Sequence, residues 1–154
     1  MRRTISRICV AFAPVLFVLF CGAAQAQAAS ACPELPGNAG LTWEYRGSGD
    51  TQLCRALRAD GSEVFGMAIT AKPTFEPQRT DRAERSQVGG RDIYWYRTEI
   101  AAKPGVQARE ALVDLPDGRS AHVWLQADSD EKLQADYQLL QGLSFGAPAQ
   151  VAGQ

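Results

Sequence analysis

Residues 108–142 decide the fold and read AREALVDLPDGRSAHVWLQADSDEKLQADYQLLQG. Two segments of this stretch, 108–115 and 120–127, alternate apolar and polar residues, and the turn Pro116-Asp117-Gly118-Arg119 separates them. An Asp-Gly turn between alternating segments is a strong hairpin signal. In the second segment, alternate residues share a face: Ala121, Val123 and Leu125 on one side, and His122, Trp124 and Gln126 on the other. The stretch therefore predicts two paired strands, the second with one apolar face.

The periodicity changes after this hairpin, where a helix is predicted. Asp128 is a residue type that caps helix N-termini, and Glu131 lies three positions later, as in a variant of the capping box. Apolar residues then recur at helical spacing: Leu133, Tyr137, Leu139 and Leu140. Gly142 is a typical helix stop. Residues 143–145 are predicted to return as a brief strand.

The chain before residue 108 consists of short alternating segments between turn residues, which favours strands. Three of them are predicted to form a meander, at residues 41–46, 53–59 and 64–70. A shorter strand is expected at 86–88, before the Gly89-Gly90 turn. These segments, with those downstream, predict an α+β domain: an antiparallel sheet of about seven strands with one C-terminal helix packed on it.

The strongest strand signal lies at residues 91–100. Ile93 and Trp95 share one face of this segment, and Tyr94 and Tyr96 share the other. Because both faces are suited to burial, we expect this to be the central strand of the sheet.

Residues 72–85 differ from the segments on either side. They contain two prolines, seven charged residues and little apolar content. We interpret them as a long exposed loop. Such a loop is either a mobile connector or, since loops of this length are often functional, a contact site for a partner. Arg79 and Arg82 are the candidates for that contact.

The N-terminal segment 1–28 has the design of a cleavable secretory signal peptide. Three arginines precede the apolar run 8–20, and small residues follow it, with frames for cleavage after residue 26 or 28. The run is shorter than the roughly 20 residues of a membrane-spanning helix. Phe20, before Cys21, is too bulky for a lipoprotein signal. We therefore expect export, to the periplasm or the medium, and no membrane insertion after cleavage.

Cleavage would leave one domain over residues 29–146 and a flexible tail over 147–154. Removing the three arginines of the signal leaves 13 basic against 17 acidic residues, a net charge near −4. Such a chain has no basic field for nucleic acid. The expected partner is a protein of the cell envelope.

The exported part of the chain retains two cysteines, Cys32 and Cys54. An even pair in an oxidising compartment predicts a disulfide. A metal site would need more cysteine or histidine ligands, and a catalytic thiol would need a free cysteine beside a histidine. His122 is the only histidine in the sequence. We therefore expect a structural bond, no metal and no cofactor.

The second half of the chain resembles small exported bacterial proteins of the PsbP-like and DcrB-like group. The order that carries the resemblance is Val88-Gly89-Gly90, the strand with Arg109-Glu110, His122-Val123-Trp124, the helix 128–140, and Gly142-Leu143-Ser144-Phe145. The resemblance implies a closing helix on an antiparallel sheet and a non-enzymatic accessory or binding role. The N-terminal half departs from the group, because the cysteine pair stands where an opening helix would be.

The sequence contains no phosphate-binding glycine loop. His122 stands alone, so we predict no catalytic residue. The aromatic residues are more informative: one helix cannot cover rings on both faces of a sheet, so at least one of Trp95 and Trp124 should reach solvent, as interface anchors do.

These observations favour a non-enzymatic periplasmic binding protein, such as an inhibitor or an immunity-type protein that recognises another protein. The predicted binding residues are Trp95, Trp124, His122, Arg79 and Arg82. An envelope accessory or assembly factor is the first alternative, and a small hydrolase that depends on His122 is the second.

Overall fold

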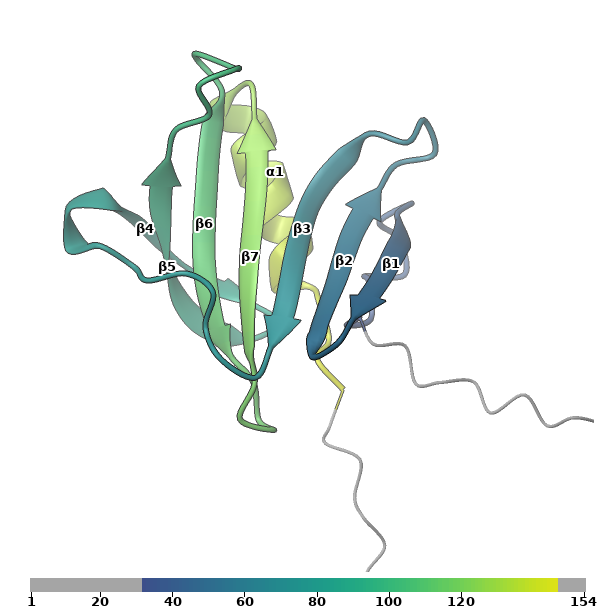
Figure 1. Cartoon of the computed structure of the whole chain (residues 1–154). Coiled ribbons are helices and arrows are strands. Elements are labelled where there is room, and N and C mark those ends of the chain that lie inside the picture. The colour runs from purple at the N-terminus through teal and green to yellow at the C-terminus, as the bar shows by residue number, and fades with distance from the viewer. Residues whose placement is uncertain (1–31, 147–154) are drawn as a thin grey trace, which may run out of the picture.

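An antiparallel sheet of seven strands with a helix on one side forms the frame of the computed structural model (Figure 1). The structure describes residues 32–146, so the predicted signal peptide 1–28 and tail 147–154 lie outside the described residues. The elements follow the chain as β1 (Thr42–Ser48), β2 (Thr51–Leu57), β3 (Glu63–Thr70), the 3-10 helix Arg79–Asp81, β4 (Arg82–Val88), β5 (Arg91–Thr98), β6 (Gln107–Asp114), β7 (Ser120–Ala127) and α1 (Asp130–Gln141). The predicted α+β class, with one C-terminal helix on the sheet, is confirmed.

Strand β7 lies in the middle of the sheet, whose order is β1-β2-β3-β7-β6-β5-β4. Its bounds are those that the alternation of residues 120–127 predicts. Burial alternates as predicted too: Ala121, Val123 and Leu125 are buried, whereas His122 and Trp124 are only partly covered. The alternation in this strand therefore predicts the identity of its two faces.

The prediction that residues 91–100 form the central strand is wrong. Strand β5 lies next to the edge strand β4. Both faces are nevertheless covered at Trp95 and Tyr96, because Trp95 is buried beneath α1 and Tyr96 lies against Phe75 from the loop after β3, whereas Tyr94 stays exposed. Burial on both faces here reflects a helix on one side and a loop on the other.

Strand β4 begins at Arg82, earlier than the strand predicted at 86–88, so the preceding loop ends at Asp81. The charges that indicated a loop are distributed over a strand that pairs with β5 through a register shift between Arg82 and Arg85. Within that irregular stretch, Glu84 reaches the side of the sheet that α1 covers. Composition alone does not distinguish such a strand from a loop, because it does not show that Glu84 has a partner inside the fold.

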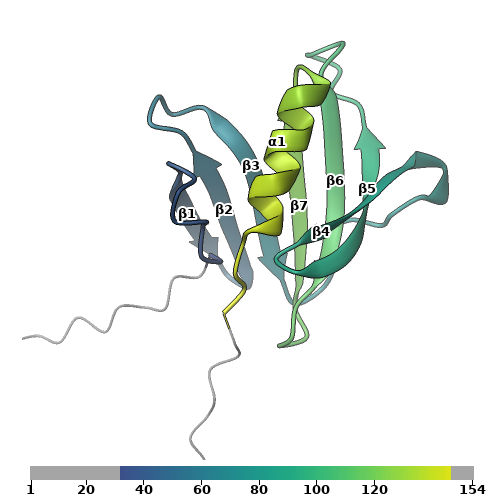
Figure 2. The ribbon, with the colours of Figure 1, turned by 180° about the vertical axis from the view of Figure 1, so that it is seen from behind.

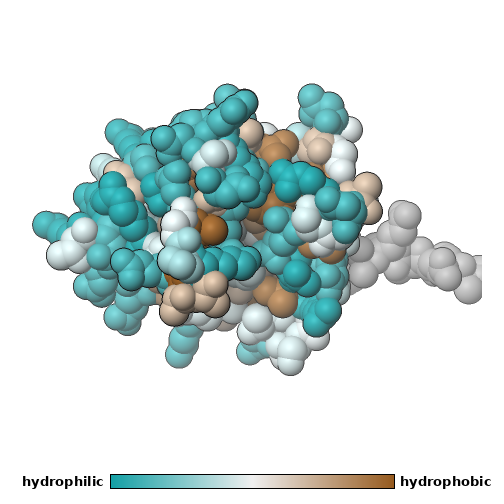
Figure 3. All heavy atoms as spheres, turned by 90° about the horizontal axis from the view of Figure 1, so that it is seen from above, coloured by the Kyte–Doolittle hydropathy of each residue, from teal (hydrophilic) through white to brown (hydrophobic). Residues whose placement is uncertain are grey.

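Helix α1 lies across one face of the sheet, and the sheet curves around it (Figure 2). Its N-cap is Ser129, whose hydroxyl accepts a hydrogen bond from the amide of Lys132, so the predicted cap Asp128 is one residue too early. Gly142 ends the helix as predicted, and the buried residues include Leu133, Tyr137 and Leu140. The end of the molecule where the helix begins is mainly hydrophilic, with apolar residues visible between the polar ones (Figure 3). Within residues 32–146, no helix is long and apolar enough to span a membrane.

Side chains beneath α1 join the helix to β4, β5 and β6. Trp95 is fully buried and stacks on Tyr137, with ring centroids 5.1 Å apart. Arg109 donates two hydrogen bonds of 3.0 Å to the carboxylate of Glu84, and the Tyr137 hydroxyl donates a third of 3.0 Å. Burial acts to raise the pKa of Glu84, but Arg109 and Tyr137 together hold it below its ordinary value. A charged Glu84 therefore anchors the helix to the twisted edge of the sheet.

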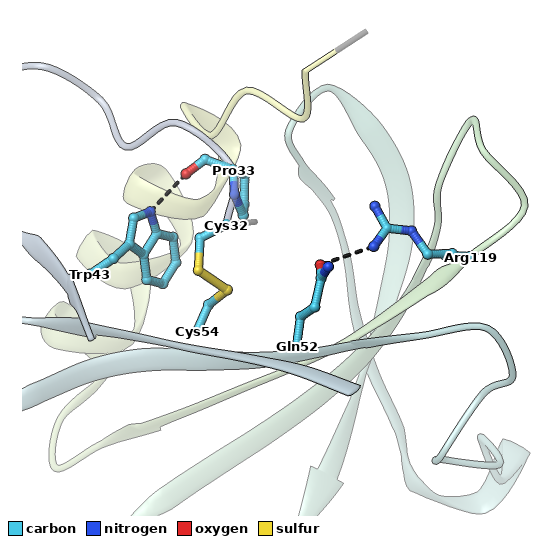
Figure 4. Close-up of a disulfide and its surroundings, with 6 residues drawn as sticks. All are labelled: Cys32, Pro33, Trp43, Gln52, Cys54 and Arg119. Carbon is cyan, nitrogen blue, oxygen red and sulfur yellow. Dashed lines mark hydrogen bonds between the residues drawn. A yellow bond between two sulfur atoms is a disulfide. The ribbon is translucent and has the colours of Figure 1, made fainter. Parts of the chain in front are cut away.

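The predicted disulfide between Cys32 and Cys54 joins the segment before β1 to β2 (Figure 4). It closes a loop with a sequence separation of 22 residues, which is worth roughly 3 kcal/mol in the chain-entropy model. Beside it, the indole Nε1 of Trp43 donates a hydrogen bond of 2.7 Å to the carbonyl of Pro33. The N-terminal segment is thus held against the β1–β2 hairpin by one covalent bond and one hydrogen bond.

Residues 143–145, predicted as a brief strand, form one isolated bridge, between Ser144 and Glu34. Phe145 lies against Gly89 at the tip of the β4–β5 hairpin, where φ is +55° and a side chain would collide with the ring. The C-terminal end of the described chain therefore connects the N-terminal segment to the far hairpin.

Asp136 is a buried carboxyl group on the sheet-facing side of α1. It is 1% exposed, and its carboxylate has no hydrogen-bond partner among the described residues. Arg58 Nη2 lies 3.9 Å away. Burial raises the pKa of Asp136, and the charges of Lys132 and Arg58 offset this only in part. The ionised carboxylate is therefore less stable in the folded protein than in the unfolded chain.

The ionisation of Asp136 should lower the free energy of unfolding of the natural protein as pH rises. We expect Asp136→Asn to abolish this contribution to the pH dependence. Because the pKa is higher in the folded state, the unfolded chain ionises first, so the free energy of unfolding falls as pH rises from the ordinary aspartate pKa, about 4, through the folded value. The free energy of unfolding can be measured with urea at a series of pH values between about 3 and 8. Relative to that of the natural protein, the value for the variant should increase as pH rises through this range. Parallel pH profiles would contradict this account.

Candidate functional site

The face of the sheet opposite α1, called the open face below, carries no α-helix within residues 32–146 (Figure 1). Residues paired across adjacent strands point to the same face. The register therefore places the neighbours of two β7 residues on the open face: Gly66 and Glu110 beside Trp124, and Ala68 and Leu112 beside His122. Two of the predicted binding residues, His122 and Trp124, thus lie together in the middle of this face.

Trp124 lies flat against strand β3. A Cβ atom at Gly66 would come closer than van der Waals contact to the indole atoms Cζ2, Cε2 and Nε1. The glycine therefore makes room for the ring in the middle of a strand, where glycine otherwise weakens the structure. The indole Nε1 donates a hydrogen bond of 2.9 Å to Glu63 Oε1. The ring is held both by the strand beneath it and by a carboxylate at its edge.

An irregularity in the pairing of β2 with β3 places Glu63 on the open face. The register shifts between Ala56 and Leu57. Val64 joins the buried core, at 1% exposure, and Glu63 can then reach Trp124 and Arg55 on the other side. β-Bulges of this kind are known to redirect a side chain near functional sites.

A row of ion pairs continues from Trp124 toward the β1 edge. Arg55 donates from Nε to Glu63 over 2.7 Å and from Nη1 to Glu44 over 2.9 Å. The hydrogen bond to Glu63 is the main cause of a raised pKa at Arg55. These side chains are about one third exposed, so the pairs add little to stability. Their effect is to fix the orientation of charges around Trp124.

The loop between β3 and β4, residues 71–81, crosses the open face in front of β7 and β6 (Figure 1). Phe75 stacks on the His122 imidazole with centroids 5.0 Å apart and meets Tyr96 edge-to-face at 5.7 Å. The predicted exposed loop is thus attached to the sheet through one aromatic side chain. Phe75 is the one phenylalanine in a charged segment, so its role could have been inferred only from the fold.

The imidazole of His122 lies between the hydroxyl of Thr74 and the carboxylate of Glu110. The Thr74 hydroxyl lies 3.4 Å from Nδ1 of His122, and Nε2 lies 3.3 Å from Glu110 Oε2 without hydrogen-bond geometry. A general base needs its partners within about 2.6–3.2 Å. With Phe75 stacked on the ring, the arrangement serves to hold the 71–81 loop better than it serves proton transfer.

A cavity of about 440 Å³ opens beside Trp124 at the end of the sheet where α1 begins. Lys103 Nζ donates to Gln126 Oε1, and Lys132 Nζ donates to the Gln126 backbone carbonyl, each over 3.1 Å. Neither ammonium group has a carboxylate within 4.0 Å among the described residues. The cavity is also lined by Arg55, Glu63 and Asp128. Because Arg55 is paired with Glu63, the two lysine ammonium groups beside the indole are the cations that could meet an acidic group. No cluster of three or more potential metal ligands occurs within residues 32–146.

The other three predicted binding residues lie elsewhere. Trp95 is fully buried beneath α1, so its prediction as an accessible binding residue is wrong: the helix covers that face of β5. Arg82 stacks on Tyr94, 4.1 Å from the ring centroid, at the β4 side of the sheet. Arg79 is exposed on the short helix before β4. Only His122 and Trp124 share a site.

Sequence reasoning missed the polar neighbours of Trp124. The two-residue turn at Gly49-Asp50 sets Glu44 opposite Arg55, so the register of this hairpin was a usable signal. Two further features depend on the pairing between β2, β3 and β7, which cannot be read from the sequence. They are the register shift that places Glu63 on the open face and the contact of Trp124 with Gly66.

Comparison of the chain with protein-family models, with curated proteins and with solved structures finds no match.

We expect Phe75→Ala to release the 71–81 loop from the sheet. The variant loses two ring contacts, each worth about 0.5–1.5 kcal/mol, while the core beneath α1 is untouched. Limited trypsin digestion should cleave after Arg79 faster than in the natural protein, as followed by mass spectrometry. Phe75→Leu, which keeps apolar bulk without stacking, should be intermediate. An unchanged cleavage rate in Phe75→Ala would show that Phe75 does not hold the loop.

Proposed function

We propose that the chain is an exported, non-enzymatic protein that binds another protein of the cell envelope through the open face around Trp124. An inhibitor or immunity-type protein is the form that fits best. The observation that carries the proposal is the fixed, partly exposed indole of Trp124, set between a row of ion pairs and a cavity that Lys103 and Lys132 line.

The surroundings of Trp124 have the features of an interface anchor. Tryptophan and arginine are among the residues most enriched in binding hot spots, which are ringed by contacts that exclude water. Here the indole is held by Gly66 and Glu63, so little side-chain freedom remains to be lost on binding. A pre-ordered anchor of this kind lowers the entropic cost of association. The same ordering would be of little use to a purely structural residue at the surface.

The charges around the indole indicate the chemistry of the partner. Arg55 and Glu63 are already paired, whereas in the described part of the chain the ammonium groups of Lys103 and Lys132 donate to an amide side chain and a backbone carbonyl. An acidic side chain of the partner, entering the cavity beside Trp124, would meet these two ammonium groups. Complementary charges of this kind mainly increase the association rate and the specificity.

The exported location is supported by two independent features. Segment 1–28 has a signal-peptide composition, and Cys32–Cys54 is a disulfide, a bond that persists in oxidising compartments. Both fit a periplasmic or secreted protein. A partner that proved to be a subunit of a membrane complex would place the chain among envelope accessory factors.

A small hydrolase is the second candidate, favoured by the order Thr74–His122–Glu110. Its contacts of 3.4 and 3.3 Å are longer than catalytic hydrogen bonds. Phe75 also covers one face of the imidazole. These distances support binding over catalysis.

We expect Trp124→Ala to weaken partner binding by about 30-fold or more, the loss of a hot-spot side chain. The partner would be captured from periplasmic extract by cross-linking, identified, purified and titrated by calorimetry. Gln138→Ala, an exposed position on α1, is the control and should bind like the natural protein. Equal affinity of all three proteins, each with an unchanged circular dichroism spectrum, would contradict the proposed binding face.

A further inference from the structure

Strand β1 is an open edge of the sheet. It is the end strand in the order and pairs, within residues 32–146, only with β2, in an unbroken register from Thr42 to Ser48. The other edge, β4, is interrupted by a register shift and lies against α1 through Glu84. Irregular, charged edges resist pairing with another chain, whereas regular ones invite it. In both ribbon views β1 borders the sheet (Figures 1 and 2).

The backbone groups that β1 presents outward follow from its hairpin. Ser48 and Thr51 flank a two-residue turn and pair with each other, and such flanking residues form a hydrogen-bonded pair. Hydrogen-bonded and non-hydrogen-bonded positions alternate along an antiparallel ladder. The N–H and C=O groups of Trp43, Tyr45 and Gly47 therefore point away from β2, toward the free edge.

We propose that β1 pairs with β1 of a second copy of this chain, antiparallel and centred on Tyr45. In that register Tyr45 faces Tyr45 of the second copy, and Trp43 faces its Gly47, so every outward N–H and C=O of the strand finds a partner. Tyr45 is 50% exposed, one of only two large apolar side chains so exposed within residues 32–146. The pairing would cover this ring.

The charges of the strand are self-complementary in the same register. Glu44 lies opposite Arg46 of the second copy, and Arg46 lies opposite its Glu44. Within one chain Arg46 already contacts Glu44, and its side chain is 70% exposed. Opposite charges directly across a ladder stabilise it, and like charges destabilise it. The row Glu63–Arg55–Glu44 on the open face would thus continue across the dimer axis.

The dimer would place two Trp124 sites on one surface. A two-fold axis between antiparallel edge strands runs perpendicular to the sheet, so both open faces point the same way. Two linked sites on one surface bind a repeated partner more tightly than either alone. Association of the purified chain can be measured without the partner of the Trp124 site.

Two single charge reversals test the pairing. Glu44→Arg brings two guanidinium groups together across the dimer ladder, and Arg46→Glu brings two carboxylates together. Each variant alone should therefore dimerise at least about tenfold more weakly than the natural protein. Mixed in equal amounts, the two variants place opposite charges across both ends of the ladder, because positions 44 and 46 are both arginine in Glu44→Arg and both glutamate in Arg46→Glu. Sedimentation equilibrium should then show a heterodimer that is tighter than either variant homodimer.

Arg85→Glu makes the same charge change on the other edge strand and should leave the dimer intact. Far-UV circular dichroism would establish that each variant is folded. Three results would overturn the inference: a natural protein that is monomeric at millimolar concentration, single reversals that dimerise normally, or a mixture that stays monomeric although both variants are folded.

Discussion

One helix of 12 residues covers a seven-stranded sheet, and this mismatch in size shapes the rest of the molecule. A helix of that length is about 18 Å long and about 10 Å wide, whereas seven strands span roughly 30 Å. The sheet meets the helix by curving around it, and the Trp95–Tyr137 stack with the Glu84–Arg109 pair fixes the curvature. The opposite face is left to the 71–81 loop and to the side chains of the sheet itself.

Side chains on the open face are held in place by hydrogen bonds and ion pairs with one another, and not by a covering layer of helices. Exposed ion pairs such as Arg55–Glu44 contribute little to stability. Their main consequence is geometric, because they hold Glu63, and Glu63 holds the indole of Trp124. Folding and recognition are therefore carried by different faces of one sheet, and substitutions on the open face should alter binding with modest cost to the fold.

The parts of the fold that the sequence predicts are those governed by nearest neighbours. Strand 120–127 and its two faces follow from alternation, and the Cys32–Cys54 bond follows from cysteine count and compartment. The prediction for Trp95 fails because alternation separates two faces without revealing which one a helix covers. The charged composition of residues 82–85 led to the prediction of a loop. The strand that forms there depends on Arg109 as the partner of Glu84, and Arg109 is 25 residues away in the sequence. The candidate site can be found only in part for the same reason. His122 and Trp124 share a strand, whereas Gly66 and Glu63 reach Trp124 through pairing between strands, and Phe75 reaches His122 from the 71–81 loop.

The central claim, that α1 covers the Trp95 face and leaves the Trp124 face open, can be tested by hydroxyl-radical footprinting with mass spectrometry. In the folded protein Trp124 should be oxidised readily, while Trp95, which is fully buried, should be protected until the protein unfolds. Bound partner should protect Trp124 as well. Oxidation of Trp95 at the rate of Trp124 in the folded protein would contradict the assignment of the two faces, and with it the proposed binding surface.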